Sequence, residues 1–388
     1  MDVKGKVLAV GLLLVVLLST GAEGYWKRLI CGTSLKTQID NAPAGAYLLS
    51  DGSCTWNVRY TIMVRKPITL RGVKAKLVEG IGGRPLMKVF AERFYLSDFV
   101  FIGNRQSVEQ SQRASLLYIS QGGFRVRRGS FINSTRDGVS VYPDRSVKNP
   151  KPIVGGDIRH IIGDGNVRDV VSLSTAGDGR ISTSNIKVRN VTAFDCSKKG
   201  AVEVSDGVHN IDIRDISAAR CIYGISIQDH GRSGFETNTQ IQISNVTVVD
   251  SLYGVLSETS TNEHSNISIT GVKLVRCHNA MLLKNIQQLE VDDVQIFWAR
   301  KAAETQIDVQ DCSGLTVRKL TFDSGGSTDT AIRIAGSKDV TFDGLRIASR
   351  FKSLYGITFY RTSFDGLSSL RVFNMDVETT LEQRVKVV

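Results

Sequence analysis

The side chains best suited to acid–base chemistry lie within, or directly after, short segments in which apolar and polar residues alternate. They are, in chain order, Glu203, Asp206, Asp229, His230 and Glu258. Two carboxylates about 5 to 9 Å apart can hydrolyse a glycosidic bond by acid–base catalysis. Alternatively, Asp206 and Asp229 could bind Ca²⁺ beside a uronate sugar while a base removes its C5 proton. The candidate catalytic residues are therefore Asp229, His230 and Glu203.

Basic and aromatic residues form a second set close to the same segments. Arg136-Asp137 and Arg168-Asp169 match each other in position, and such arginines suit sugar carboxylates because the guanidinium group pairs with them through two hydrogen bonds. Tyrosine rings suit the flat faces of pyranose sugars. The candidate substrate-binding residues are Arg136, Asp137, Arg168, Asp169, Lys199, Tyr223, Gln228 and Glu258. The alternative is that the arginine–aspartate pairs are ordinary surface ion pairs, which contribute little.

The segments that carry these residues are repeats. An apolar-polar-apolar unit recurs at spacings of 23 to 32 residues, which predicts a short strand in each copy. The first apolar residues of the copies are Val139, Val171, Val202, Ile225, Val255, Met281, Ile307, Ile332 and Ile357. Outward side chains then form one row that includes Ser172, Glu203 and Ser226, and a second row that includes Ser174, Ser205, Gln228 and Glu258.

A second strand unit repeats with the same cadence. Its copies begin at Asn185, Asn210, Gln240, Asn266, Gly314 and Asp339. The sixth position of each copy is Asn, Asp or Gly, except for Lys319, and these residue types tolerate the positive φ angle of a tight bend. Two of these bend positions, Asn190 and Asn245, also belong to glycosylation sequons, as do Asn133 and Asn266.

Short strands stacked at about 4.8 Å per turn predict an all-β parallel solenoid of about ten rungs. Residues 66–361 resemble the single-stranded right-handed parallel β-helix of the pectate-lyase-like superfamily, and residues 62–72 are similar to its first rung. Residues 35–45 are expected to form a short capping helix. The resemblance implies a single elongated domain at residues 62–365, preceded by a cap segment at 25–61 and followed by a last strand and cap at 366–388.

The resemblance does not select a subfamily. The polygalacturonase-like set Asn-Thr-Asp, Asp-Asp, Gly-His-Gly and Arg-Ile-Lys is missing, since Leu345-Arg-Ile-Ala348 lacks the lysine. The Arg-x-Pro-x-x-Arg pattern of pectate lyases and the Asp-Pro-His-Asp motif of alginate epimerases are missing too, and Asp229-His230 is only weakly similar to a lyase Asp-His pair. Unrelated activities share this scaffold, so no subfamily's catalytic residues transfer to this chain.

Charge and composition limit the classes of molecule that this protein is expected to bind. The 388 residues carry a formal net charge of +11, which favours a polyanionic partner. The basic residues form no long run and are not interleaved with aromatic residues, which disfavours nucleic acid. Beyond the N-terminus no apolar run reaches the length of a membrane span, so no stable membrane insertion is expected. The expected partner is an anionic polysaccharide, and the sequence gives no oligomeric state.

The N-terminus predicts export. Lys4 and Lys6 precede an apolar stretch at residues 7–18, and small residues follow it, with cleavage after Ala22 or Gly24. The mature chain is thus expected to be extracellular, or periplasmic in a bacterium. In that compartment Cys31 and Cys54 are the preferred disulfide pair. Three of the other four cysteines, Cys196, Cys221 and Cys277, are expected to form an internal ladder of small residues, with a Cys196–Cys221 disulfide as the alternative.

These inferences favour a secreted enzyme that acts on an acidic extracellular polysaccharide by lyase or hydrolase chemistry. Ca²⁺ is the one cofactor that the carboxylates suggest. The rival hypothesis is a non-catalytic glycan-binding or structural surface protein that uses the same face of the solenoid. The clustered carboxylates and imidazole favour the enzyme, whereas the missing subfamily motifs favour the rival.

Overall fold

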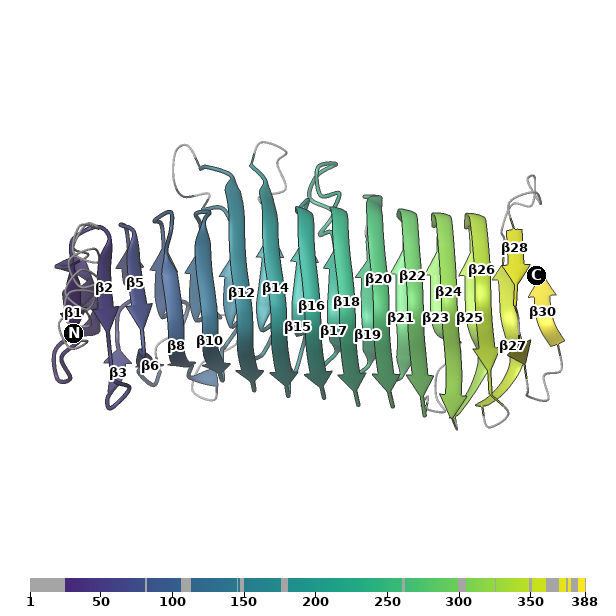
Figure 1. Cartoon of the computed structure of the whole chain (residues 1–388), viewed down its shortest axis with the longest axis horizontal. Coiled ribbons are helices and arrows are strands. Elements are labelled where there is room, and N and C mark those ends of the chain that lie inside the picture. The colour runs from purple at the N-terminus through teal and green to yellow at the C-terminus, as the bar shows by residue number, and fades with distance from the viewer. Residues whose placement is uncertain are drawn as a thin grey trace, which may run out of the picture.

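A computed structural model describes residues 25–80, 82–105, 113–144, 146, 150–175, 181–259, 262–298, 305–324, 326–348, 351–360, 370–374, 376–377 and 383–387. The expected targeting segment lies outside these residues. Figure 1 shows an elongated coil in which each turn of the chain lies beside the next, from the N-terminal to the C-terminal end. Every recorded strand pairing is parallel, as a solenoid requires.

One face of the solenoid is a 13-stranded sheet, named here sheet B. Nine of its strands, β11 to β27, coincide with the nine repeats found in the sequence, and the remaining four lie at the two ends. Its strands are β4 (Ile62–Val64), β7 (Met87–Val89), β9 (Leu117–Ile119), β11 (Val139–Val141), β13 (Val171–Ser174), β15 (Gly200–Ser205), β17 (Tyr223–Gln228), β19 (Tyr253–Glu258), β21 (Asn279–Lys284), β23 (Thr305–Gln310), β25 (Gly326–Ala335), β27 (Phe351–Tyr360) and β30 (Gln383–Val387).

The second sheet, sheet A, contains 17 strands. They are β1 (Trp26–Arg28), β2 (Ala46–Leu49), β3 (Thr55–Val58), β5 (Ile68–Arg71), β6 (Lys74–Leu77), β8 (Tyr95–Ile102), β10 (Phe124–Ile132), β12 (Ile153–Asp164), β14 (Thr183–Phe194), β16 (His209–Ala219), β18 (Thr239–Val249), β20 (His264–Val275), β22 (Ile286–Phe297), β24 (Ser313–Ser324), β26 (Lys338–Ile347), β28 (Leu370–Phe373) and β29 (Asp376–Val377).

A bend divides each long strand of sheet A. The bend residue has a positive φ in ten successive strands: Asp98, Arg128, His160, Asn190, Asp215, Asn245, Gly271, Asp293, Lys319 and Gly344. The bend expected from the second repeat is therefore present, and it includes Lys319 at φ 48°. A lysine has no side-chain preference for this conformation, so the stacked turns on both sides must impose it.

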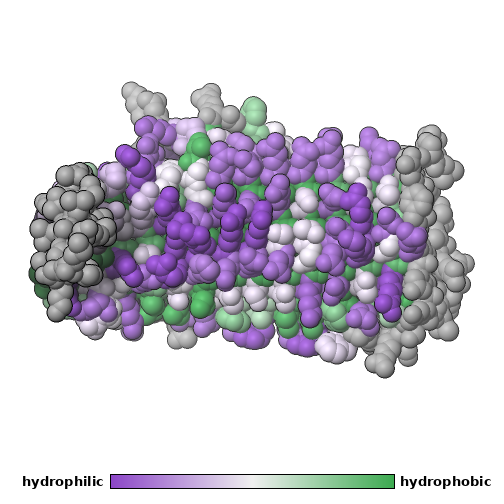
Figure 2. Space-filling model, viewed as in Figure 1, coloured by the Kyte–Doolittle hydropathy of each residue, from purple (hydrophilic) through white to green (hydrophobic). Residues whose placement is uncertain are grey.

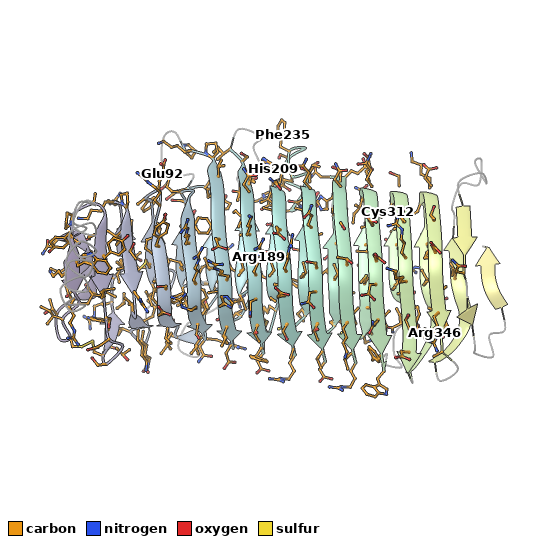
Figure 3. All side chains as sticks on the ribbon, viewed as in Figure 1. Glu92, Arg189, His209, Phe235, Cys312 and Arg346 are labelled. Atoms are coloured by element: carbon orange, nitrogen blue, oxygen red, sulfur yellow. A yellow bond between two sulfur atoms is a disulfide. The ribbon has the colours of Figure 1, made fainter. Side chains whose placement is uncertain are left out.

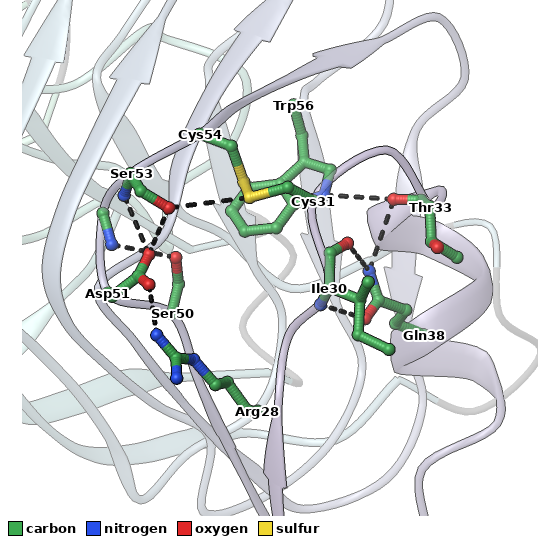
Figure 4. Close-up of a disulfide and its surroundings, with 11 residues drawn as sticks. Arg28, Ile30, Cys31, Thr33, Gln38, Ser50, Asp51, Ser53, Cys54 and Trp56 are labelled. Carbon is green, nitrogen blue, oxygen red and sulfur yellow. Dashed lines mark hydrogen bonds and ion pairs between the residues drawn. A yellow bond between two sulfur atoms is a disulfide. The ribbon is translucent and has the colours of Figure 1, made fainter.

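The N-terminal cap contains the one helix of the described residues, α2 (Leu35–Asp40). The Ser34 side chain accepts a hydrogen bond from the Thr37 backbone N–H and caps this helix. A disulfide joins Cys31 to Cys54, and the Trp56 indole beside it donates a hydrogen bond to the Thr33 carbonyl (Figure 4). No helix in the described residues is long and apolar enough to cross a membrane.

Inward-facing Ile, Val and Leu side chains form one continuous core through the solenoid. Because each turn buries its apolar side chains against its neighbours, a single turn would have no core of its own. Cys196, Cys221, Cys277 and Cys312 are buried and take part in no disulfide, so the alternative Cys196–Cys221 bond is not formed. The Ser251 Oγ accepts a hydrogen bond from the Cys221 N–H, which places this small residue beside the cysteines.

Candidate functional site

A groove of about 500 Å³ crosses the outer face of sheet B. It runs along the solenoid axis from Tyr118 on β9 to the residues that follow β17. The strand register stacks Tyr118, Ser140, Ser172 and Glu203 in one outer row, as the repeat predicts for the last three. The groove is lined by Pro85, Arg113, Ala114, Ser115, Tyr118, Arg136, Ser140, Tyr142, Arg168, Ser172, Ser174, Glu203, Ser205, Asp206, His230 and Arg232.

A carboxylate and an imidazole form the centre of one end of the groove. Asp206 follows β15 and His230 follows β17, and the Ser205–Gln228 pairing of those strands brings the two side chains together. The Nδ1 atom of His230 lies 2.5 Å from Asp206 Oδ1, and Ser174 Oγ donates to Asp206 Oδ2 at 2.6 Å. Arg232 forms an ion pair with the same carboxylate. His230 is 42% exposed while Asp206 is buried, so the imidazole is the accessible member of the pair.

Hydrogen bonds to the buried Glu236 fix the loop that carries His230. Glu236 is fully buried and accepts hydrogen bonds from the His230 N–H at 2.9 Å and from Arg232 Nε at 2.9 Å. The loop also packs on the backbone of Gly207, where a Cβ would lie 2.3 Å from the Phe235 carbonyl oxygen. Phe235 itself, labelled at the upper edge of Figure 3, is 64% exposed at the tip of this loop. These contacts fix where the imidazole stands relative to Asp206.

The two partners shift each other's protonation. The hydrogen bond to Asp206 raises the pKa of His230 above its usual 6.5, against the opposing effect of burial. Burial would raise the pKa of Asp206, but hydrogen bonds from His230, Ser174 and Arg232 outweigh it and lower that pKa. The raised pKa makes the His230 imidazole a stronger base than an unperturbed histidine, and its exposed ring can exchange a proton with a ligand in the groove.

Glu203 lies on β15, three residues before Asp206, and its carboxylate has several hydrogen-bond partners. It accepts hydrogen bonds from Lys199 Nζ at 2.8 Å, Arg168 at 3.0 Å and Ser172 Oγ at 3.1 Å. Burial opposes its ionisation, but the charges of Lys199 and Arg168 lower the pKa of Glu203. Lys199 also donates to Gln228 Oε1 at 2.8 Å. The carboxylate is 1% exposed, so it anchors the cations rather than standing free in the groove.

A buried layer lies beneath Arg168. Asp137 and Asp169 are 0% exposed, with Asp137 Oδ1 3.4 Å from Arg168 Nε. Tyr223 donates its hydroxyl hydrogen to Asp169 Oδ1 at 2.9 Å, and the Gly200 N–H donates to the same oxygen. Burial, together with the charges of Glu203 and Asp137, raises the pKa of Asp169 well above its usual value. The surroundings of Asp169 therefore favour its protonated form.

The structure brings some of the predicted site residues together and separates others. Glu203, His230, Arg136 and Arg168 line the groove. By contrast, Asp137, Asp169 and Tyr223 are buried and do not line the groove. Asp137 pairs with Arg168, and the Tyr223 ring centroid lies 5.8 Å from Lys199 Nζ, so these residues contact the predicted cations.

Asp229 is oriented differently from its neighbour His230. Its Oδ2 accepts hydrogen bonds from both the backbone N–H and the side-chain Nδ2 of Asn262, each at 2.8 Å. Asp229 does not line the groove. Glu258 and Gln228 pair with each other along the second outer row, but neither lines the groove.

The sequence suggests Asp206 and Asp229 as ligands of a Ca²⁺ ion. No group of three or more His, Cys, Asp or Glu side chains in the described part of the chain is placed to hold a metal ion. Asp206 and Asp229 face different partners, and Arg232 already occupies one oxygen of Asp206. A cation at Asp206 would meet a guanidinium and an imidazolium, so these residues do not fit Ca²⁺.

Eleven of the sixteen groove residues were not predicted as site residues, and four of these carry charged or aromatic side chains: Arg113, Tyr118, Tyr142 and Arg232. Tyr118 lies on β9, which precedes the first of the nine sequence repeats at Val139. Arg232 lies two residues after His230, and this spacing alone gave no sign that it would fold back onto Asp206. The ring centroids of Tyr118 and Tyr142 are 6.3 Å apart in an edge arrangement.

Solved structures resemble this chain, although no protein-family model matches its sequence and no curated protein does. The A-module of mannuronan C-5 epimerase AlgE6 from Azotobacter vinelandii gives a TM-score of 0.60 at 14% identity, covering 88% of this chain and 92% of that chain. The catalytic domain of a GH87 α-1,3-glucanase in complex with nigerose gives 0.56 at 8% identity, covering 94% and 70%. At these low identities the similarities show the fold alone, a right-handed parallel β-helix, which confirms the parallel solenoid predicted from the repeats.

Proposed function

We propose that this protein is a secreted carbohydrate-active enzyme that binds an acidic polysaccharide in the groove of sheet B and cleaves it by lyase chemistry. The observation that carries the proposal is the accessible His230–Asp206 pair in a groove that also presents four arginines and two tyrosines. Two neighbours in fold, an epimerase named for mannuronan and a glucanase bound to nigerose, support a carbohydrate ligand.

The charges of the groove support an anionic ligand. Its lining contains four arginines but only two carboxylates, Glu203 and Asp206, and both are already paired with cations. Arg136 is 47% exposed in its side chain, so its guanidinium group is accessible to a sugar carboxylate. Tyr118 and Tyr142 would flank a pyranose ring at that end of the groove.

The protonation states favour a lyase over a hydrolase. Hydrolysis by a carboxyl pair needs one carboxyl that is protonated. Glu203 and Asp206 both have lowered pKa values, so neither supplies that proton near neutral pH. In β-elimination, the arginines would neutralise the uronate carboxylate and so acidify its C5 proton. Neutral His230 would take that proton at Nε2 and, as the imidazolium, donate it to the leaving glycosidic oxygen as the C4–O bond breaks and the C4–C5 double bond forms, which regenerates the imidazole.

Asp206 acts in this proposal through His230. It holds Nδ1, so Nε2 is the ring nitrogen that remains for proton transfer, and it raises the imidazole pKa. Asp229, which the sequence suggested as the acid or base, would instead hold the His230 loop through Asn262. The export signal predicted in residues 1–24 and the Cys31–Cys54 disulfide support secretion.

A non-catalytic glycan-binding protein is the second candidate. It is favoured by one specific observation: each groove carboxylate is fully engaged with a cation or hydroxyl group, as in a fixed binding surface. In that case His230 would contact the sugar without transferring a proton.

A turnover screen separates the two candidates. Purified protein is incubated with pectate, alginate, glycosaminoglycans and neutral glucans, with and without Ca²⁺, while unsaturated-uronate absorbance and reducing ends are recorded together. A lyase gives both signals on one acidic polymer, and H230N removes them. Reducing ends without absorbance would show a hydrolase instead. Binding to one polymer with no product in any arm would establish the glycan-binding protein.

A further inference from the structure

A column of four arginines lies on the outer face of sheet A, away from the groove. Arg127, Arg159, Arg189 and Arg214 occupy the same position on four successive strands, β10, β12, β14 and β16. We call this column the arginine ladder. Neighbouring strands lie about 4.8 Å apart, so the four side chains span about 14 Å along the solenoid axis. Figure 2 shows a dense hydrophilic patch over these strands, and Figure 3 labels Arg189 at its centre.

Two aspartates partly neutralise the ladder, and each is shared. Asp157 pairs with Arg127, whose Nε lies 2.7 Å away, and with Arg159 at 3.3 Å. Asp212 pairs with Arg189 at 2.6 Å and with Arg214 at 2.5 Å. Four guanidinium groups therefore share two carboxylates, so the ladder carries excess positive charge.

The adjacent column adds to that charge. It reads Arg125, Asp157, Lys187 and Asp212 on the same four strands. Six cations thus face two anions within two neighbouring columns. The ladder arginines keep 24%, 37%, 37% and 48% of their side-chain surface exposed, in chain order. Their guanidinium groups therefore remain accessible to a ligand.

The same column changes character further along the solenoid. The two strands that follow Arg214 carry Ser244 and Thr270, and the next three carry Asp292, Arg318 and Asp343. Those last three alternate in sign, which is the arrangement that stabilises neighbouring strands, whereas like charges directly opposite each other destabilise them. A run of four arginines is therefore not explained by folding, and it points to an external anion.

We propose that the arginine ladder is a second, non-catalytic binding surface for a linear acidic polysaccharide. The ladder is one side chain wide and runs along the axis, with one cation per strand, close to the advance per sugar of an extended polyuronate. A guanidinium group can hold a carboxylate or sulfate group through two hydrogen bonds. This surface lies on sheet A and the groove on sheet B, so the proposal does not depend on catalysis in the groove.

The test uses the variant R159Q/R189Q. It removes two ladder cations but leaves Arg127 with Asp157 and Arg214 with Asp212, so neither aspartate loses its last partner. The matched control is R220Q/R276Q, which removes two arginines from one-to-one pairs with Asp195 and Asp250 at another corner of the solenoid. Both variants lower the net charge by two. Thermal unfolding establishes that both are folded.

Binding of polygalacturonate is measured at several salt concentrations. We expect R159Q/R189Q to bind about tenfold more weakly at low salt, with the slope of log K against log salt reduced by about two, because each ladder cation displaces one counterion. The control should stay within about twofold. Affinity for a short oligogalacturonide that fits only the groove should not change in either variant.

Other outcomes would overturn the proposal. Equal losses in both variants would show that only net charge matters, and no loss would show that the ladder does not bind the polymer. Ladder-dependent binding to anionic lipid vesicles, with unchanged polygalacturonate binding, would assign the surface to a membrane. A protein without turnover can still bind the polymer, so this experiment gives an answer whether or not the groove is catalytic.

Discussion

Sheet B has two halves with the same backbone and different outer surfaces. From β9 to β17 its outer row reads Tyr118, Ser140, Ser172, Glu203 and Ser226, and the groove lies over it. From β19 to β25 the same row reads Leu256, Leu282, Asp308 and Arg333. The strand register continues without a break from one half to the other. Function must therefore lie in the outward side chains and in the loops.

The ion pairs of the two halves differ in the same way. In the second half, Asp308 pairs with Arg333, whose Nε lies 2.9 Å from Asp308 Oδ1, and also accepts a hydrogen bond from Gln310 Nε2. In the first half, Glu203 holds both Arg168 and Lys199 over the buried acids Asp137 and Asp169. The first arrangement places one cation on one carboxylate, whereas the second places two cations and three carboxylates in one cluster. This difference indicates that the first half is built to hold charges in place.

The largest expected difference between the halves concerns turnover. H230N should lower the rate about 10²- to 10⁴-fold, the usual contribution of a positioned acid–base group, without changing the unfolding temperature. H278N, in the turn that follows β20, is the matched control and should keep full rate. Because the neutral form of His230 takes up the C5 proton, the rate should rise as pH rises through its raised pKa. Equal rates for H230N and the native protein would remove His230 from the mechanism.

Stability should separate the halves next. E203Q leaves Arg168 and Lys199 without their shared carboxylate in a buried cluster, so we expect a loss of about 3 to 5 kcal/mol in the free energy of unfolding. D308N weakens a pair whose carboxylate is buried but whose arginine side chain is 37% exposed, so it should cost less, about 1 to 2 kcal/mol. Denaturant titrations of both variants test this. Comparable losses would mean that the Glu203 cluster is no more interdependent than the Asp308–Arg333 pair.

The pH dependence of stability should reveal the buried proton on Asp169. Its pKa is raised in the folded protein, so folding favours the protonated form. That contribution is complete below the unfolded pKa near 4 and is lost as pH rises through the folded value. D169N keeps the shape and removes the titration, so unfolding free energy should decline less above about pH 4 than in the native protein. Parallel curves would show that Asp169 is ionised in the fold.

The smallest effect concerns two buried serines, one in each half. Ser174 donates to the Asp206 carboxylate, whereas Ser257 donates to the Lys284 carbonyl at 3.3 Å. A hydrogen bond to a charged group contributes about 1.5 to 3 kcal/mol and one to a neutral group about 1 kcal/mol. S174A should therefore be less stable than S257A by about 1 kcal/mol, and only S174A should shift the pH profile of turnover. A larger loss in S257A would reverse this assignment.

Predictions from the sequence were most accurate where a residue's place in the repeat fixes its place in the solenoid. The bend ladder was predicted from Asn, Asp and Gly at the sixth repeat position, and the stacking of Ser172, Glu203 and Ser226 followed from the repeat spacing. Each of these depends on a period that the sequence itself repeats.

Side-chain direction was less predictable. Asp229 and His230 are adjacent in sequence, yet His230 bonds to Asp206 while Asp229 bonds to Asn262. Tyr223 looked like a sugar-stacking residue, but its ring is buried and its hydroxyl group serves Asp169. Arg232 reaches the site because its loop folds over Gly207. Loop conformation and burial decided these three cases. Neither recurs with the sequence repeat, so the repeat could not predict them.

The sequence by itself therefore determined the solenoid, its strand order and the rows of side chains, because stacking in register turns a spacing along the chain into a neighbour in space. The tertiary structure alone decided which charged residues are buried and which proton each one holds. Burial and the surrounding charges set protonation, and they come from side chains on other strands and from loops folded over them. The fold could be read from the repeat, but the groove and the arginine ladder acquire their chemistry only when the turns are stacked.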